Sequence, residues 1–214
     1  MIEDLRLHTA YSPKLEAYHL SFIKNLKGNF LHSLFFRKKI QNFKKAFDHI
    51  KKIPVQDSRL TPDSEIYKQI IYIDIANDIY YRLKFDIPFI EGIIKKYGFK
   101  VRQLLLNEER LHYDPNHINS LLLHVYLNQF PTVDKPIITI YHPYIGYELV
   151  IDGNKRFEQA RIRKMESIPA FRLPSTAFNH ILNDQVSSAL FALHHNFTML
   201  RNPFRLGKHY FYFQ

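Results

Sequence analysis

The residues with the clearest chemical potential lie between positions 146 and 160, where an apolar run meets a basic segment. The apolar run is typical of a buried strand, Asp152 and Gly153 break it, and a helix is predicted to begin directly afterwards. The free N–H groups and the positive dipole end of a helix N-terminus favour an anion such as phosphate. Gly153 has no Cβ to keep a ligand from the main chain, and Arg156 offers a planar fork of donors. The sequence therefore predicts an anion site at this turn, although Asp-Gly also serves many ordinary turns.

Composition narrows the classes of protein. The 214 residues are 46% hydrophobic and 15% aromatic, which predicts a packed core. The absence of cysteine excludes disulfides, thiolate metal sites and cysteine nucleophiles. The net charge of +10 favours nucleic acid, nucleotides or an acidic surface as partners, with a general basic bias on solvated faces as the alternative.

The first residues lack a basic stretch followed by an apolar core, and no apolar run approaches the ~20 residues of a membrane span. A cytoplasmic protein with no membrane partner is expected.

The N-terminal half is predicted to be helical. Ser12-Pro13 begins one helix, and a second fits residues 30–52. The second helix has an apolar seam, and three lysines seven residues apart lie on its far side: Lys38, Lys45 and Lys52. This basic face is either a contact surface for a nucleic-acid backbone or the soluble face of a core helix.

Two further helices are expected before residue 100. Thr61-Pro62 resembles a helix start, and the isoleucine- and tyrosine-rich run to residue 83 is assigned to a helix on length and caps, with strand as the competing assignment. A helix from Pro88 to Tyr97 is predicted to end at Gly98.

From residue 101 the pattern changes to alternating strands and helices. Strands are predicted at 104–106, 136–140, 147–151 and 168–173, with helices after Asp114-Pro115 and after Gly153. Pro169 places the last strand at an edge or turns its backbone nitrogen outward. The fold class is therefore α+β: a helical region 1–100, an α/β domain 101–174, and a helical, aromatic extension 175–214 that packs on the rest.

Residues 101–174 resemble the ParB/sulfiredoxin superfamily of small α/β domains. The resemblance lies in the order of elements and in three segments: Pro136-Ile137-Ile138, the run from Tyr147 to Arg156, and Ile168-Pro169-Ala170. Members bind nucleotide phosphates at the strand-to-helix turn. The resemblance therefore implies that phosphates are bound by four consecutive residues: Gly153, Asn154, Lys155 and Arg156.

The branches of this superfamily imply different activities. Sulfiredoxins have a cysteine where Asn154 stands, which excludes their reductase chemistry here. Partition-type ParB proteins carry two further domains, and about 40 residues after Leu173 are too few for both. The free-serine kinase branch implies Glu108 or Glu109 as the base, and Asp152 as the partner of a hydroxyl group or of Mg²⁺.

The sequence departs from the kinase pattern at several positions. Kinase members have histidines at the places of Asn154 and Lys155. Lys164 stands where a glycine usually ends the helix, and Arg161 and Lys164 fall on its inward face, so the helix is either shorter or tilted. Without the resemblance, Glu108 and Glu109 are typical of a solvated loop.

Other sites have little support. His194 and His195 are adjacent, so both cannot face one metal ion from a helix, and no other histidine pair has ligand spacing. Walker, Rossmann and Gly-x-Ser-x-Gly motifs are absent.

Three hypotheses follow. The first is a nucleotide-binding protein, with phosphotransferase or nucleotide hydrolase activity that uses Mg²⁺. The second is a DNA- or RNA-binding protein that holds backbone phosphate at the same turn and adds the basic 30–52 helix. The third is a superfamily member that only mediates protein contacts.

Overall fold

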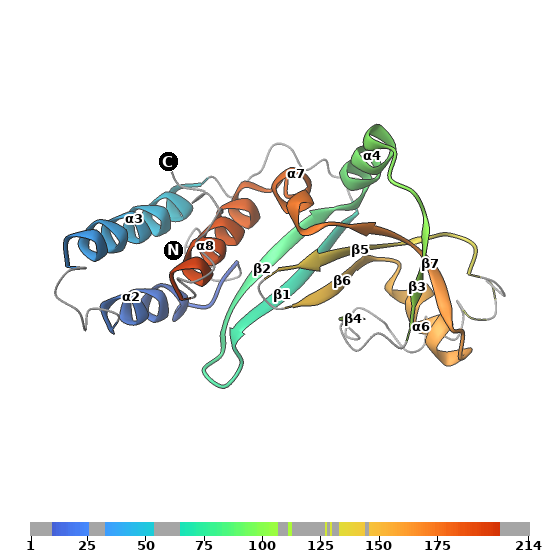
Figure 1. The fold of residues 1–214 in the computed structure, drawn as a ribbon, viewed down its shortest axis with the longest axis horizontal. Coiled ribbons are helices and arrows are strands. Elements are labelled where there is room, and N and C mark those ends of the chain that lie inside the picture. Colours follow the sequence, from blue (N-terminus) through green and yellow to red (C-terminus); the bar gives the residue numbers. More distant parts are fainter. Residues whose placement is uncertain are drawn as a thin grey trace. The chain divides into compact units, whose positions relative to one another are not determined.

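The structure is a computed structural model that describes residues 10–25, 33–53, 65–106, 111–112, 127, 129, 133–143 and 146–201. Its helices and strands confirm the α+β class (Figure 1). No helix in these ranges is long and apolar enough to cross a membrane. The elements of the chain are α2 (Leu15–Asn25), α3 (Ser33–Lys52), β1 (Ile66–Asp74), β2 (Ile79–Asp86), α4 (Ile87–Tyr97), β3 (Arg102–Leu105), β4 (Leu111–His112), β5 (Ile137–His142), β6 (Tyr147–Asp152), α6 (Asn154–Ile162), β7 (Ser167–Leu173), η4 (Ser175–Ala177), α7 (Phe178–Ile181) and α8 (Gln185–Arg201).

The chain divides into two compact units. One contains residues 1–62, 70–84 and 182–214, and the other contains residues 63–69 and 85–181. The dividing points within residues 63–85 fall in β1 and at the end of β2, so the hairpin contributes to both units.

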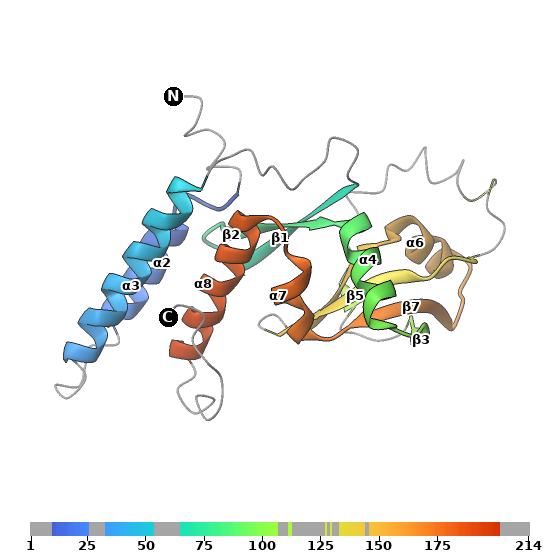
Figure 2. The same cartoon turned by 90° about the horizontal axis from the view of Figure 1, so that it is seen from above.

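The first unit is built around three helices. α3 lies against both α2 and α8, and Figures 1 and 2 show α2 beside α3. The predicted seam of α3 is confirmed at Phe43, Phe47 and Ile50, which are all buried. Lys45 and Lys52 are exposed on the same helix, as its amphipathic pattern requires.

The helix predicted over residues 61–83 is wrong where the structure describes it. Residues 66–86 form the two-stranded hairpin β1-β2, with a turn at 75–78 in which Asp78 adopts a φ of 54°. Buried residues alternate along β2, which is the period of a strand. The isoleucines and tyrosines of this run favour a pleated strand over a helix, and this preference outweighs the cap-like signal at 61–62.

α4 shows why the next helix was predictable. Asp86 caps it by accepting a 3.1 Å hydrogen bond from the backbone N–H of Phe89, and Pro88 lies in its first turn. Gly98 ends it in the left-handed conformation, with φ at 64°.

The second unit contains a five-stranded sheet with the order β3-β7-β5-β6-β4. β5 pairs antiparallel with β6 and parallel with β7, and β3 pairs antiparallel with β7. β7 is therefore an inner strand, so the first of the two alternatives predicted for Pro169, an edge strand, is wrong. Pairing of β7 with β5 begins at Ala170, so Pro169 precedes the ladder on that side.

The helical extension predicted from residue 175 is divided in the structure. α7 ends at Ile181, and α8 begins at Gln185 after a break at Leu182–Asp184. Asp184 stabilises the new start because its carboxylate accepts a 2.8 Å hydrogen bond from the backbone N–H of Ser187.

Burial lowers the pKa of two histidines in the first unit. Burial lowers the pKa of His194 to about 3, and its Nδ1 forms a 2.7 Å hydrogen bond with the Tyr81 hydroxyl. Burial, and secondarily the nearby His194, also lowers the pKa of His19, whose ring lies 4.1 Å from the Phe197 ring between centroids. Both imidazoles are therefore neutral in the folded protein at neutral pH.

The free energy of unfolding should fall as pH decreases from 6.5 towards 3. In this range the unfolded chain protonates His194 while the folded protein does not, so acid favours unfolding. At pH 5 this residue alone accounts for a loss of roughly 2 kcal/mol, from 1.36 kcal/mol per pKa unit. Urea unfolding of the wild type and of His194→Gln between pH 7.5 and 5 measures the effect, and an equal slope in both proteins would contradict it.

Candidate functional site

The strand-to-helix turn is built as the sequence predicts. Leu149, Val150 and Ile151 of β6 are buried, and Gly153 adopts a φ of 83°, in the left-handed region. Its carbonyl then accepts a 2.8 Å hydrogen bond from the N–H of Phe157, the first bond of α6. The N–H groups of the first helical turn precede any intrahelical acceptor and are available to a ligand.

The start of α6 is fixed by the burial of one side of the helix. Phe157 and Ala160 pack into a cluster with residues of four strands of the sheet, which are Leu104, Ile137, Val150, Ile168 and Ala170. Burying a side chain the size of phenylalanine stabilises by about 2–3 kcal/mol. The N-terminal turn of α6 is therefore held rigidly against the end of β6.

The sequence left two alternatives for α6, a shorter helix or a tilted helix, and the far end of α6 supports the first. The helix ends at Ile162, and Lys164 adopts a left-handed φ of 53°. Arg161 and Lys164 are both exposed. The helix is thus shorter, and the two cations do not enter the core.

Arg156 turns back over Gly153 and binds Asp152. Its Nη2 lies 2.7 Å from Oδ2 of Asp152 and 3.3 Å from the carbonyl oxygen of Pro136. Both side chains of the ion pair are 19% exposed. A Cβ at position 153 would lie 2.8 Å from Nη2 of Arg156 and 2.6 Å from a methyl carbon of Ile137, so only glycine permits this contact.

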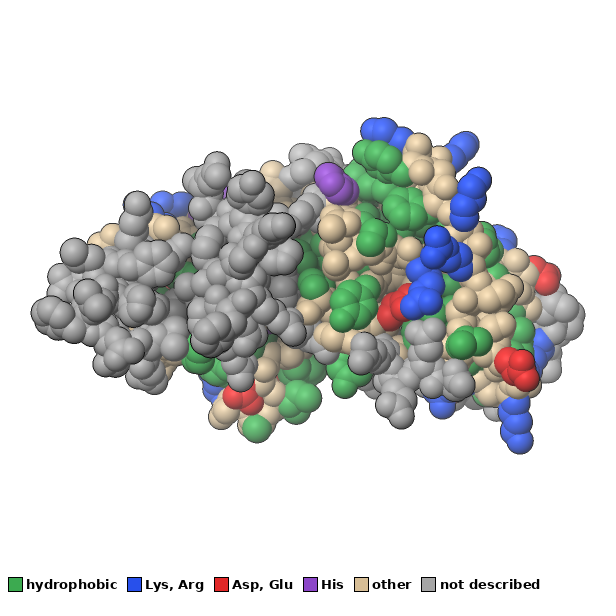
Figure 3. Space-filling model, in the orientation of Figure 1, with side chains coloured by type: hydrophobic (Ala, Val, Ile, Leu, Met, Phe, Trp, Pro, Cys, Tyr) green, Lys and Arg blue, Asp and Glu red, His purple; other side chains and the backbone are tan. Residues whose placement is uncertain are grey.

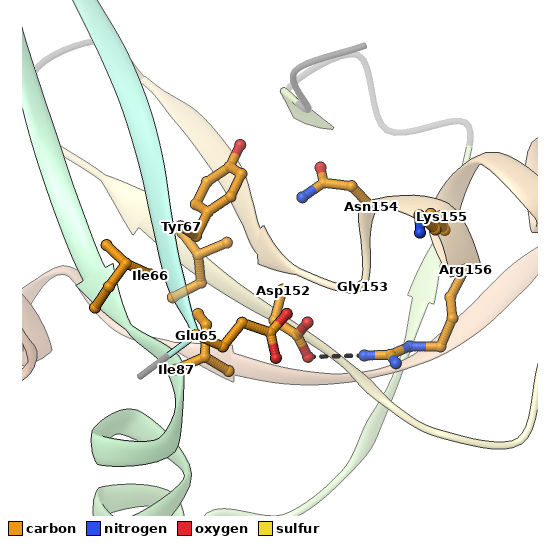
Figure 4. A pocket seen from close by; sticks show the side chains of 10 residues that line it. Glu65, Ile66, Tyr67, Ile87, Asp152, Gly153, Asn154, Lys155 and Arg156 are labelled. Atoms are coloured by element: carbon orange, nitrogen blue, oxygen red, sulfur yellow. Dashed lines mark hydrogen bonds and ion pairs between the residues drawn. The ribbon is translucent and has the colours of Figure 1, made fainter. Parts of the chain in front are cut away.

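This turn opens into a pocket of about 260 Å³ (Figure 4). Five consecutive positions of β6 and α6, from Asp152 to Arg156, lie in its wall, and the structure therefore brings together all the phosphate-binding residues implied by the resemblance. Ile151 also contributes. The remaining wall comes from elsewhere in the same unit: Glu65, Ile66, Tyr67 and Ile87.

Several polar groups of the pocket retain hydrogen-bonding capacity. The ammonium group of Lys155 has no partner within the described part of the chain. Oδ1 of Asn154 and Nε of Arg156 are buried and likewise have no hydrogen-bond partner among the described residues. Buried polar atoms without partners are rare in proteins, so these groups are suited to bind an additional polar species.

The other predicted residues are described only in part. Glu108 and Glu109 lie outside the described residues, as does the side chain of Lys38. Lys45 and Lys52 belong to α3, in the first unit. Within the described residues no group of three or more acidic or histidine side chains could hold a metal ion.

The wall formed by Glu65, Tyr67 and Ile87 was not predicted from the sequence. The helix predicted over this segment gave no reason to place it beside the turn. Two signals in the sequence favour a hairpin that begins at Ile66. The isoleucine content of β1 is typical of a strand, and residues that are apolar alternate with polar ones along β2. No signal in the sequence indicates that this hairpin starts next to Gly153.

A second acidic residue of β6 is occupied by a different network. Glu148 is buried and accepts hydrogen bonds from the Thr139 hydroxyl at 2.5 Å and from Arg172 at 2.9 Å and 2.5 Å. These partners lie on β5 and β7, so the network joins three adjacent strands. Removing one member would leave a buried charge without its partner, and the role of Glu148 is therefore to hold the sheet.

Comparisons with known proteins return few matches. No protein-family model and no curated protein sequence matches the chain. Among solved structures, sulfiredoxin from Arabidopsis thaliana aligns with a TM-score of 0.27 and 18% identity over 39% of this chain and 97% of that protein. The C-terminally truncated chromosome-partitioning protein ParB from Caulobacter crescentus, complexed with CTP-gamma-S, aligns with a TM-score of 0.31 and 15% identity over 50% of this chain and 65% of that protein.

These two proteins belong to the superfamily that residues 101–174 resemble.

The two left-handed positions flanking α6 should respond oppositely to substitution. Gly153→Ala should lower the free energy of unfolding by about 2–4 kcal/mol, because the new methyl group adds backbone strain and crowds Ile137. Lys164→Gly should raise it by about 0.5–1 kcal/mol, because glycine adopts a positive φ without strain. Chemical denaturation measures both. A stabilising Gly153→Ala, or a destabilising Lys164→Gly, would contradict this account of the turn.

Proposed function

We propose that the pocket at the start of α6 binds a nucleotide through its phosphate groups. One observation carries this proposal: Lys155, Arg156 and the N-terminal turn of α6 all lie in the wall of a single pocket. Positive side chains and a helix N-terminus are the groups that proteins use to hold phosphate.

Phosphate binding at this site exchanges one anion for another. Arg156 is already paired with the carboxylate of Asp152 through Nη2, while its Nε has no described partner. A phosphate group carries more charge than a carboxylate and matches the planar donors of arginine. It therefore displaces Asp152 from Arg156, and Lys155 provides a second positive charge.

The displaced carboxylate of Asp152 suits Mg²⁺. Magnesium in nucleotide sites is held by one or two carboxylates together with the phosphates, and Asp152 is an oxygen donor in the same pocket as the proposed phosphate ligands. When bound, the ion would neutralise charge on the phosphates.

A phosphotransferase or nucleotide hydrolase activity would need a base in addition to this binding site. Glu108 and Glu109 remain the predicted bases for the substrate hydroxyl or for water. Asp152 is held by Arg156, and it becomes available to a metal ion or hydroxyl group once phosphate takes the guanidinium.

Nucleotide should stabilise the wild type and stabilise Arg156→Gln much less. A ligand at 100 times its dissociation constant adds about 2.7 kcal/mol to the free energy of unfolding. Loss of the charge-assisted bonds from Arg156 should weaken binding roughly 10- to 100-fold. Thermal unfolding with ATP, ADP, CTP and GTP, each with Mg²⁺, measures the effect.

Two variants serve as controls for this experiment. Arg102→Gln removes an exposed arginine of β3 in the same unit and should leave nucleotide binding unchanged. Asp152→Asn frees Arg156 from its carboxylate, so in the absence of Mg²⁺ it should bind nucleotide more tightly than the wild type. Equal stabilisation of the wild type and Arg156→Gln, or no stabilisation by any nucleotide, would refute the proposal.

Nucleic-acid binding is a second candidate, favoured by the exposed lysines of α3. Lys44, Lys45 and Lys52 are exposed, whereas Lys51 is paired with Glu16 at 2.7 Å. Figure 3 shows the Lys and Arg side chains of its face in several separate places, which is typical of general basic charge. The nucleic-acid-binding hypothesis therefore depends on the exposed lysines of α3 alone.

The lysines of α3 can be tested through salt dependence. If duplex DNA binds there, replacing both Lys45 and Lys52 by Gln should reduce the slope of log affinity against log salt by about 2, or about 0.9 for each lost phosphate contact. The control replaces Lys95 and Lys100, two exposed lysines of the other unit. An equal reduction in both double variants would show only a general charge effect.

A further inference from the structure

The proposed phosphate site has an opposite wall whose chemistry is different. Glu65 stands directly before β1, and its backbone carbonyl accepts a 3.0 Å hydrogen bond from the N–H of Ile87 at the start of α4. Ile66, Tyr67 and Ile87 add apolar surface to this wall. The α6 side of the pocket thus carries two cations together with the carboxylate of Asp152, and the other side carries the carboxylate of Glu65 and apolar side chains.

Tyr67 holds this wall in place. Its hydroxyl donates a 2.7 Å hydrogen bond to Oε1 of Gln69, and its ring stacks on Phe85 with 6.4 Å between centroids. Both Tyr67 and Phe85 are buried. The wall is therefore an ordered surface against which a ligand can be positioned.

The carboxylate of Glu65 is unpaired in the described part of the protein, in contrast to that of Asp152. Asp152 is bound to Arg156, whereas no described residue forms a side-chain hydrogen bond or ion pair with Glu65. Figure 4 shows the Glu65 side chain extending from the start of β1 towards the side of the pocket where Asp152 lies. An ionised carboxylate has only acceptors, so it selects a ligand group that donates.

A ligand that satisfies both walls must combine a phosphate with a hydrogen-bond donor. In a nucleotide the phosphates meet the start of α6, and the base meets Glu65 and the apolar side chains. We propose that Glu65 accepts a hydrogen bond from an exocyclic amino group of the base, so that the pocket selects cytosine and adenine nucleotides over uracil and hypoxanthine nucleotides. This inference rests on the proposed nucleotide-binding function.

The selection follows from the polarity of one substituent. Cytosine and adenine carry an amino group where uracil and hypoxanthine carry a keto oxygen. The amino group donates to the carboxylate, whereas the keto oxygen is an acceptor that the carboxylate repels. A site that hydrogen-bonds a ligand N–H discriminates strongly against an analogue without it, because its own polar group then loses its water without gaining a partner.

Two matched pairs of nucleotides test the proposal. Dissociation constants of CTP and UTP, and of ATP and ITP, are measured by calorimetry with and without Mg²⁺ for the wild type and for Glu65→Gln. The wild type should bind the amino member of each pair roughly tenfold more tightly. In Glu65→Gln the preference should fall below about threefold, mainly because UTP and ITP bind better, since an amide can also donate a hydrogen bond.

The control is Glu91→Gln, which removes the same charge from an exposed position of α4 in the same unit. It should leave both ratios unchanged. Equal binding within each pair in the wild type would refute the role of Glu65 while leaving phosphate binding intact. Equal weakening of all four nucleotides in Glu65→Gln, seen only with Mg²⁺, would instead make Glu65 a metal ligand. If no nucleotide binds the wild type, the proposed function itself fails, and the role of Glu65 fails with it.

Discussion

The left-handed turn at Gly153 is the constraint on which the candidate site depends. Because residue 153 has no Cβ, β6 can end and α6 can begin within one residue, and the guanidinium group of Arg156 can lie directly over the main chain. Burial of Phe157 and Ala160 against the sheet then fixes the direction of α6. The backbone N–H groups and Arg156 are thereby presented at one place before any ligand arrives, which reduces the entropic cost of binding.

The ion pair between Asp152 and Arg156 has two consequences for this site. It keeps the guanidinium group ordered in the absence of a ligand, since Nη2 also contacts the carbonyl of Pro136. It also means that an anion that binds through Nη2 of Arg156 must first replace a carboxylate. The site is therefore expected to favour polyanions, whose additional charge can reach Lys155 and the N-terminal turn of α6 at the same time.

Apart from β4, the elements that the structure describes between residues 101 and 174 were predictable, and the causes are local. Short apolar runs predicted the strands, and Asp152-Gly153 predicted the turn, because buried strands and left-handed turns need these residue types. The hairpin at 66–86 was assigned to helix because Thr61-Pro62 imitates a helix start, although the content of isoleucine and tyrosine favours strand. Pro169 suggested an edge strand for another reason. A proline interrupts a sheet only where its backbone nitrogen would have to donate to a neighbouring strand, and pairing with β5 begins one residue later, at Ala170. The register that decides this cannot be read from the sequence.

One wall of the pocket is formed by consecutive residues and the other by residues that are distant in the sequence. Recognition of the phosphate and recognition of the rest of the ligand therefore depend on different parts of the fold. The turn from Asp152 to Arg156 is a local structure whose phosphate chemistry can be inferred from five consecutive residues. The opposite wall depends on a hydrogen bond between Glu65 and Ile87, which are 22 positions apart, and on the burial of Tyr67. Under the proposed function, the phosphate contacts come from this short motif, whereas the choice of the ligand's other end depends on the packing of β1 and α4. A sequence motif at the turn alone thus predicts that phosphate binds, but it does not predict what the phosphate is attached to.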